Sequence, residues 1–379
     1  MEISPGSMAS FFAAIPDPRD RAKCRHKLLD ILIIAVLAAL CGAEYWTEVE
    51  FFATEEEEWL REFLELPGGI PSHDTFGRVF SILDPKALTE SFIGWVNAAK
   101  EDHPGDVISL DGKTSRRSFD TATGKSSLHL VSAFSHESGM VLGQRAVDGK
   151  SNEIKAIPEL LKLIQIRGKV VTIDAMGCQR EIARVIKERK GDYVLALKGN
   201  QGRMHEDLRE HFHWARKNDF KDVPFDYAET TDKGHGRIEV RRVWCTEDIV
   251  WLEGKDAWKG LKGYVAVESE RIVGDKTSRE TRFFVSSLVS TSAQRMGEIV
   301  RAHWSIENRL HWMLDVVLNE DQSRVRKGNA PEVTAILRHV LLNLLRMDKV
   351  TKGSIRSKRI RASLNRDYRV RALLGFPPE

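Results

Sequence analysis

The spacing of apolar residues changes once along the chain, near residue 105. From residue 10 to about 100, apolar positions recur with the period of a helix, which predicts an all-helical region. The stretch Leu28–Leu40 is apolar nearly all round and predicts a buried helix. A further helix is predicted to begin after Ser72, whose hydroxyl suits an N-cap.

Beyond residue 105, short apolar runs alternate with helical stretches. Strands are predicted at 107–110, 128–134, 140–147, 169–173 and 193–197, with helices at 152–164 and 179–190. This β-β-β-α-β-α-β order is typical of an α/β layer in which three antiparallel strands lead into parallel ones. From about 200 to 290, a helix at 204–217 and strands at 225–230, 237–244, 264–270 and 281–288 predict a β-rich insertion. Helical spacing resumes at 293 and continues, with breaks, to the end.

Composition sets the broad class of the protein. A length of 379 residues predicts two or three structural units. The four cysteines are far apart and match neither a disulfide framework nor a zinc motif, so a reducing, cytoplasmic setting is expected. The apolar stretch Ile31–Ala43 is too short to cross a bilayer and starts too late for a signal peptide, so no membrane association is expected.

Positive charge is concentrated at the end of the chain. The formal net charge is only +3, yet Lys349–Arg371 holds nine basic residues and one acid. A basic tail on a near-neutral protein indicates a polyanion as partner. Two alternatives stay open, namely a solvated helix face and a tail that pairs with the acidic run Glu55–Glu58 of the same chain.

Three acidic residues lie in settings that suit metal binding. Asp111 and Asp174 each follow an apolar run, and Glu307 lies in a helical stretch. In the predicted layer the first and fourth strands are neighbours, so the two aspartates are expected to lie side by side at one sheet edge. Oxygen ligands of this kind suit Mg²⁺, and two such ions can act together on a phosphodiester. For each aspartate alone, a role as turn or helix-cap residue is the alternative.

Around Glu307, polar residues recur every four positions. His303, Glu307, His311 and Asp315 form one slowly winding stripe on the predicted helix, and the other face is apolar. The stripe indicates a site, although a solvated helix face has the same pattern. The histidine spacing matches no zinc motif, so carboxylates with Mg²⁺ are the simpler interpretation.

Eight ordered segments resemble DDE-type bacterial insertion-sequence transposases, within the ISAs-type group that includes the H-repeat-associated proteins of Rhs elements. The segments include LDGKTSRRS, VTIDAMGCQ and HWSIENRLHWMLDV, and the match runs nearly end to end. They lie at 26–42, 69–80, 110–118, 150–161, 171–179, 192–201, 234–241 and 303–316.

The resemblance implies a ribonuclease-H-like catalytic core with Asp111, Asp174 and Glu307 as the catalytic, metal-binding triad. It implies two Mg²⁺ ions, with Mn²⁺ as a substitute, and cleavage at the ends of an insertion sequence followed by strand transfer into target DNA. The expected division is a helical domain at 1–102 that recognises DNA ends, a catalytic domain at 103–348 that includes the insertion, and a basic tail at 349–379. A metal-dependent endonuclease without strand transfer and an inactive DNA-binding protein are the alternatives.

Double-stranded DNA, as terminal inverted repeats and target, is the expected partner, bound by a homo-oligomer. The residues expected to contact it are Lys113, Arg116, Lys198, Asn200, Gln201, His303, Arg356, Lys358, Arg359 and Arg361. Residues 198–200 also fit a plain turn after a strand. Tryptophans of the insertion (Trp244, Trp251 and Trp258) fit either base stacking or packing.

The chain departs from the pattern of related transposases in two places. Those proteins often carry Tyr seven residues before the glutamate, Arg four residues before it and Lys seven residues after it. At these positions this chain has Val300, His303 and Leu314, respectively. The usual DNA contacts there are therefore absent or replaced, with His303 as the nearest substitute. In addition, Ser115-Arg116 stands where the group tends to have Leu-Arg-Gly.

Overall fold

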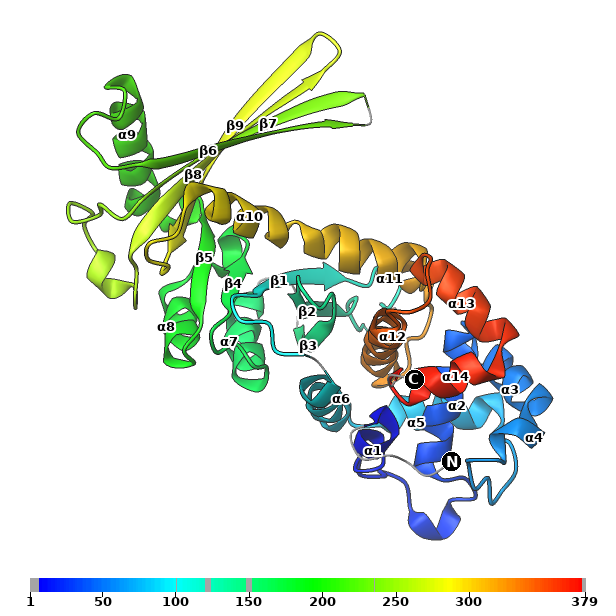
Figure 1. Cartoon of the computed structure of the whole chain (residues 1–379). Coiled ribbons are helices and arrows are strands. Elements are labelled where there is room, and N and C mark those ends of the chain that lie inside the picture. Colours follow the sequence, from blue (N-terminus) through cyan, green and yellow to red (C-terminus); the bar gives the residue numbers. More distant parts are fainter. Residues whose placement is uncertain (1–6, 100, 120–123, 148–151, 235, 377–379) are drawn as a thin grey trace.

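A single nine-stranded sheet forms the centre of the protein (Figure 1). The structure, a computed structural model, describes residues 7–99, 101–119, 124–147, 152–234 and 236–376. The strand order is β3-β2-β1-β4-β5-β9-β8-β7-β6. The strands are β1 (Val107–Thr114), β2 (His129–Ser135), β3 (Val141–Val147), β4 (Val170–Ile173), β5 (Asp192–Leu197), β6 (Asp226–Gly234), β7 (Arg237–Thr246), β8 (Gly263–Val273) and β9 (Lys276–Ser286).

The first five strands follow the predicted order. β1 pairs antiparallel with β2 and parallel with β4, so the expected neighbourhood of the first and fourth strands is confirmed. The parallel pairing ends at Leu110 and Ile173, but β1 itself continues to Thr114 along β2. Asp111 therefore lies within a strand, whereas the apolar pattern had placed it at the strand's end.

Strand alternation divides β1 between two helical layers. Val107 belongs to the apolar cluster beneath α10 (Ala293–His303), and Ile108 belongs to the main core with α7 (Glu153–Leu163) and α8 (Arg180–Glu188). Successive strand residues point to opposite faces. Asp111 and Lys113 consequently share the α10 face, and Gly112 lies on the α7 face.

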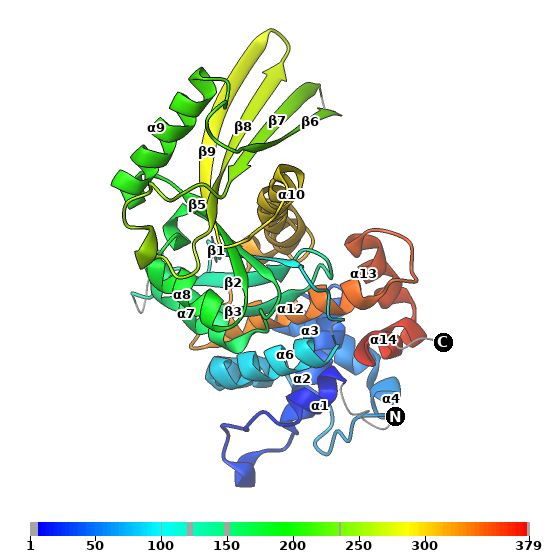
Figure 2. The ribbon, with the colours of Figure 1, turned by 60° about the vertical axis from the view of Figure 1, so that its left-hand side comes forward.

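The insertion extends the same sheet and does not form a separate body. β9 pairs antiparallel with β5, and β8, β7 and β6 follow outward as long strands (Figures 1 and 2). α9 (Arg203–Lys217) packs beside them. Aromatic side chains fill this region: Trp244 and Trp258 are buried, and Trp251 stacks on His211.

Helices from both ends of the chain pack together at the other end of the molecule (Figure 1). The N-terminal helices are α1 (Met8–Phe12), α2 (Leu28–Leu40), α3 (Trp46–Glu55), α4 (Glu57–Leu60), α5 (His73–Ile82) and α6 (Pro85–Ala99). They surround α12 (Ala330–Met347), which contacts α2, α5, α6 and β3. The expected N-terminal domain thus shares its core with the C-terminal helices, and its role in end recognition stays a prediction. Among the described residues, none of the helices is long and apolar enough to cross a membrane.

The basic tail folds into α13 (Ile355–Leu364) and α14 (Arg366–Leu373). Glu56 forms ion pairs with Arg366, at 2.8 Å, and with Arg369, at 3.1 Å. The Arg369 guanidinium also lies over the Trp59 ring, 4.8 Å from its centroid. Much of the tail is therefore held against the acidic run, as the alternative interpretation of the sequence expected.

Candidate active site

Asp111 and Asp174 occupy equivalent positions on neighbouring parallel strands. The last parallel pair is Leu110 with Ile173, and each aspartate is the next residue along its strand. By alternation, both carboxylates belong to the face that α10 covers. The sequence prediction that this pair meets at one sheet edge is consistent with the register.

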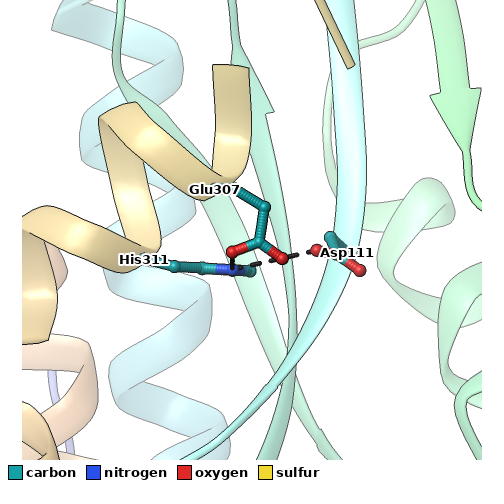
Figure 3. A group of neighbouring side chains, drawn as sticks. All are labelled: Asp111, Glu307 and His311. Carbon is teal, nitrogen blue, oxygen red and sulfur yellow. Dashed lines mark hydrogen bonds and ion pairs between the residues drawn. The ribbon is translucent and has the colours of Figure 1, made fainter. Parts of the chain in front are cut away.

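Glu307 reaches the same place from the long helix that follows the insertion. α10 contacts β1 and β4, and the chain then makes a π-helical turn over Glu307–His311 before α11 (Trp312–Val316). Such bulges occur frequently at functional sites. The turn directs the side chains of Glu307 and His311 toward Asp111 on β1 (Figure 3).

His311 lies close to both carboxylates (Figure 3). Its Nδ1 is 3.2 Å from Glu307 Oε2 and 3.8 Å from Asp111 Oδ2. The hydrogen bond with His311 lowers the pKa of Glu307. Burial, with the nearby charges of Glu307 and Asp174, raises the pKa of Asp111 to about 7, although His311 and the Gly112 amide act in the opposite direction. A positive charge placed here would relieve the repulsion among these acids.

The spacing of these atoms fits a metal ion. One ligand atom from each of Asp111, Glu307 and His311 lies within 4.8 Å of the other two. Adjacent ligands of an octahedral ion with bonds of about 2.1 Å lie roughly 3.0 Å apart, so small side-chain movements would close the set. His311 Nε2 is buried without a hydrogen-bond partner among the described residues.

Asp174 lies outside this group of three. It caps the short turn Ala175–Gly177, and its Oδ1 accepts from the backbone amides of Met176 at 3.1 Å and Gly177 at 3.3 Å. Its negative charge still acts on its neighbours. Burial lowers the pKa of His303 and the Asp174 charge works against that lowering, while the same charge helps to raise the pKa of Asp111. The cap and the metal-ligand interpretations are therefore compatible, because a carboxylate has a second oxygen.

The polar stripe on the helix faces the sheet. His303 Nδ1 is 3.3 Å from the Thr172 hydroxyl of β4, and Asp315 Oδ1 is 2.7 Å from Lys113 Nζ on β1. The half-buried His303 ring is thus engaged with β4 in this conformation. Val300 and Leu314, the other two positions that depart from related transposases, are buried in apolar cores.

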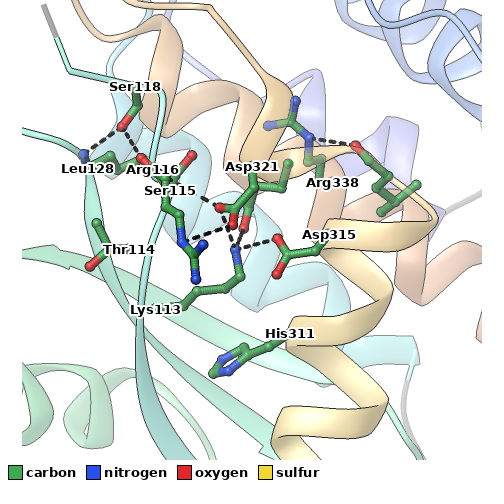
Figure 4. Close-up of polar contacts among 12 residues, drawn as sticks. Lys113, Thr114, Ser115, Arg116, Ser118, Leu128, His311, Asp315, Asp321 and Arg338 are labelled. Carbon is green, nitrogen blue, oxygen red and sulfur yellow. Dashed lines mark hydrogen bonds and ion pairs between the residues drawn. The ribbon is translucent and has the colours of Figure 1, made fainter.

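Lys113 joins β1 to the segment after α11 (Figure 4). Its Nζ lies 2.6 Å from Glu320 Oε2, 2.7 Å from Asp315 Oδ1 and 3.4 Å from Asp321 Oδ1. Burial alone would lower the pKa of Lys113, but the charges of Glu320 and Asp315 outweigh it and raise the pKa. The expected DNA contact is therefore engaged inside the protein, close to the site.

Two more of the expected DNA contacts, both in the loop after β5, hold the turn that follows Asp174. Asn200 Nδ2 donates to the Ala175 carbonyl, and Gln201 Nε2 donates to the Cys178 carbonyl, each at 2.6 Å. Lys198 in the same loop is exposed. Arg116 is also exposed, with 82% of its side chain accessible, and forms an ion pair with Asp321.

The four tail residues divide into two pairs. The Lys358 ammonium is buried, donates to the Leu345 carbonyl at 3.1 Å and lies 3.8 Å from Asp348. Arg359 donates to the carbonyls of Val317 and Ala39. Arg356 and Arg361 are exposed and remain available to a partner.

Sequence reasoning left the role of His311 open and missed a support beneath β1. The buried pair of His129 Nε2 and Glu153 Oε1, 2.6 Å apart, packs against the backbone of Gly112. A Cβ at Gly112 would lie 2.5 Å from Glu153 Oε1. The four-residue spacing was a signal for His311, whereas residues 129 and 153 have no local signal.

Comparison with known proteins identifies the family of the chain. A family model described as "Transposase DDE domain" matches residues 102–344, and one described as "DDE_Tnp_1-associated" matches residues 9–96. The chain is 42% identical over 366 residues to "Putative transposase YncI" of Escherichia coli O157:H7, which covers 96% of this chain and 93% of that protein. It is 39% identical over 366 residues to "H repeat-associated putative transposase YhhI" of Escherichia coli (strain K12), with 95% and 96% covered.

One solved structure that resembles this chain is the piggyBac transposase synaptic complex with hairpin DNA. The likeness covers 97% of this chain and 78% of that one, with 11% sequence identity and a TM-score of 0.40. That likeness is too distant to support an argument. The family match does support an argument, because it spans the sheet and the helix that bring Asp111 and Glu307 together. On that basis the chain is an enzyme of the DDE-domain transposase family.

Proposed function

We propose that this transposase cuts DNA at the ends of an insertion sequence and joins the freed ends to target DNA. The observation that carries the proposal is the convergence of Asp111 and Glu307, from segments almost 200 residues apart, in a chain of this family. Asp111, Asp174 and Glu307 are the proposed catalytic, metal-binding triad. The proposed ions are two Mg²⁺, with Mn²⁺ as a substitute.

When bound, such ions activate the attacking oxygen and stabilise the leaving 3′-oxygen. The chain's own residues supply a preformed set of ligands. β1 and β4 hold the two aspartates at neighbouring register positions, and the π-helical turn brings Glu307 toward Asp111. A site that is rigid before substrate arrives needs little reorganisation during the reaction. The sheet order of β1–β5, with three antiparallel strands leading into parallel ones, supports a ribonuclease-H-like core.

We include His311 in the proposed ligand set. Its Nδ1 is as close to Glu307 as adjacent ligands of one ion would be. Imidazole is a ligand that transition metals accept, whereas Mg²⁺ favours oxygen ligands. Removing His311 should therefore weaken Mn²⁺ binding more than Mg²⁺ binding. Electron paramagnetic resonance of bound Mn²⁺ would detect a directly bound nitrogen without any cleavage.

For DNA contact we retain the exposed residues Lys198, Arg116, Arg356 and Arg361. The proposed partner is double-stranded DNA, bound by a homo-oligomer so that two element ends can be held together. Phosphate contacts by such residues position the duplex without specifying its sequence.

The triad is tested by Asp111→Asn, Asp174→Asn and Glu307→Gln on a labelled fragment that carries a terminal repeat. Loss of charge stabilisation worth several kcal/mol predicts rate losses of at least ~10³ in each variant, with DNA binding largely kept. Asp256→Asn, on the insertion, is the control. If any one of the three variants cuts at nearly the wild-type rate, that residue is not in the triad. Glu307 is misassigned if Glu307→Gln stays active and Asp315→Asn does not.

The same gels separate the alternatives. Joined products support transposition. Products that are cut but never joined would indicate an endonuclease, and shifted bands without cutting would indicate a DNA-binding protein.

A further inference from the structure

A cleft of about 570 Å³ lies away from the acidic site. α2, α3 and α5 form one wall, and α12, α13 and the segment 318–327 form the other. Ala35, Ala39 and Leu337 contribute apolar surface, and Tyr45 and Trp46 add aromatic rings. The volume is in the range of small-molecule sites and is too small for a duplex. None of the three proposed catalytic acids lines it.

The cleft has a marked excess of positive charge. Two acidic residues line it, Glu44 and Asp74. The basic residues that line it are Arg78, Arg324, Arg326, Lys327, Arg338 and Arg359. A concave surface of one charge sign concentrates ions of the opposite sign, so the expected ligand is an anion.

Two of these arginines are fixed in place by backbone carbonyls. Arg338 Nε donates to the Leu318 carbonyl at 3.3 Å, and an Arg359 terminal nitrogen donates to the Ala39 carbonyl at 3.0 Å. Figure 4 shows Arg338 on the same side of the view as Asp315 and Asp321. Among the described residues we find no ion pair between either guanidinium and a carboxylate. The two guanidinium groups are therefore oriented, with nearby acids but no carboxylate in direct contact.

Partial burial makes this arrangement of charge costly. Burial lowers the pKa of Arg338, against the opposing charges of Glu320 and Glu44, and it lowers the pKa of Arg359 as well. Arg359 Nε and the Thr334 hydroxyl are buried without a hydrogen-bond partner in the described part of the chain. An oxyanion would supply an opposite charge in direct contact and an acceptor for both groups.

We propose that this cleft binds the phosphate of a nucleotide, with Arg338 and Arg359 on the phosphate, Arg78 at the mouth and the base along Tyr45 and Trp46. Guanidinium groups match phosphate oxygens with paired hydrogen bonds, and aromatic rings stack on bases of any sequence. The nucleotide is either free in solution or an unpaired unit of a DNA strand. The proposal goes beyond cleavage and strand transfer, because it needs neither metal nor chemistry.

The test is calorimetric titration of the metal-free full chain with deoxyadenosine monophosphate, deoxyadenosine and inorganic phosphate. The monophosphate should bind at least about tenfold more tightly than the nucleoside, since hydrogen bonds to a charged group are worth more than one tenfold step. Arg338→Gln and Arg78→Gln should each weaken binding of the monophosphate by about tenfold. Arg209→Gln, on the exposed face of α9, should not change its affinity.

Arg78→Gln keeps the test decisive if Arg338→Gln fails to fold, because Arg78 is exposed and donates to the Thr75 hydroxyl of its own helix, at 3.4 Å. If a single-stranded oligodeoxyadenylate competes with the monophosphate, the natural ligand is an unpaired DNA nucleotide. If it does not compete, the ligand is a free nucleotide. Equal affinities for the monophosphate and the nucleoside would overturn the proposal. So would wild-type monophosphate affinity in Arg78→Gln. Neither result would bear on cleavage, which is measured separately with metal and DNA.

Discussion

Replacing Lys113 with methionine should destabilise the protein through the acids that surround the ammonium. Methionine keeps most of the length of the side chain and removes only its charge. Glu320 is 2% exposed at its side chain and Lys113 is 12% exposed, so the lost charge deprives a buried carboxylate of its contacting cation. At an effective dielectric constant of about 20, one pair at this distance is worth roughly 6 kcal/mol before desolvation.

The net cost should be smaller than that Coulomb energy. Removing one partner of a buried ion pair costs about 3–5 kcal/mol. Because Asp315 and Asp321 keep partial access to water, we expect about 3 kcal/mol, the lower end of that range. If all 379 residues unfold together, an unfolding entropy of about 2.1 cal/mol/K per residue converts this into a fall in Tm of about 4 °C.

Thermal unfolding of four proteins measures the effect: wild type, Lys113→Met, Glu320→Gln and the double variant. Glu320→Gln should recover part of the loss in the double variant, because it removes the buried charge that Lys113 no longer neutralises. Lys162→Met, on the exposed face of α7, is the matched control and should change stability by less than about 0.5 kcal/mol. An unchanged Tm in Lys113→Met, together with weaker DNA binding, would refute the structural role and restore the DNA contact.

Three other predictions follow from the site and the tail. Without metal, Asp111→Asn should raise Tm at pH 8 but not at pH 4. The Asp111 pKa is about 7 in the folded protein and near 3.8 in the unfolded chain, so ionising Asp111 destabilises the folded protein increasingly as pH rises between these values. The neutral asparagine removes this penalty. Equal shifts at both pH values would contradict this. Gly112→Ala should cost about 1–3 kcal/mol and slow cleavage, since its Cβ would collide with the Glu153 carboxylate, whereas Gly199→Ala, with open space around it, should be neutral in both assays. The double change of Arg356 and Arg361 to Gln should weaken specific and random DNA alike and make the salt dependence of log affinity shallower by up to about 1.8, with Tm unchanged. A lower Tm with an unchanged salt slope would show that these arginines serve the fold.

Local pattern was enough to predict the elements and much of their arrangement. Apolar runs bounded by turns gave the strands and helices, because burial of one face imposes its period on the sequence. The strand order then placed Asp111 beside Asp174, and the parallel register between β1 and β4 agrees with that placement. Glu307 was identified from its motif and not from geometry.

Tertiary structure alone decided what the charged residues contact. Lys113 and Glu320 are 207 residues apart in the chain, and Arg369 and Glu56 are 313 apart. Nothing local in the sequence distinguishes a lysine that binds DNA from one that neutralises a buried acid, because both settings favour a long cationic side chain on a strand or helix. The same holds for Lys358 and Arg359, which the tail's charge grouped with Arg356 and Arg361. The folded chain separates them, because Lys358 and Arg359 donate to backbone carbonyls inside the protein, whereas an exposed charge can keep water until DNA arrives.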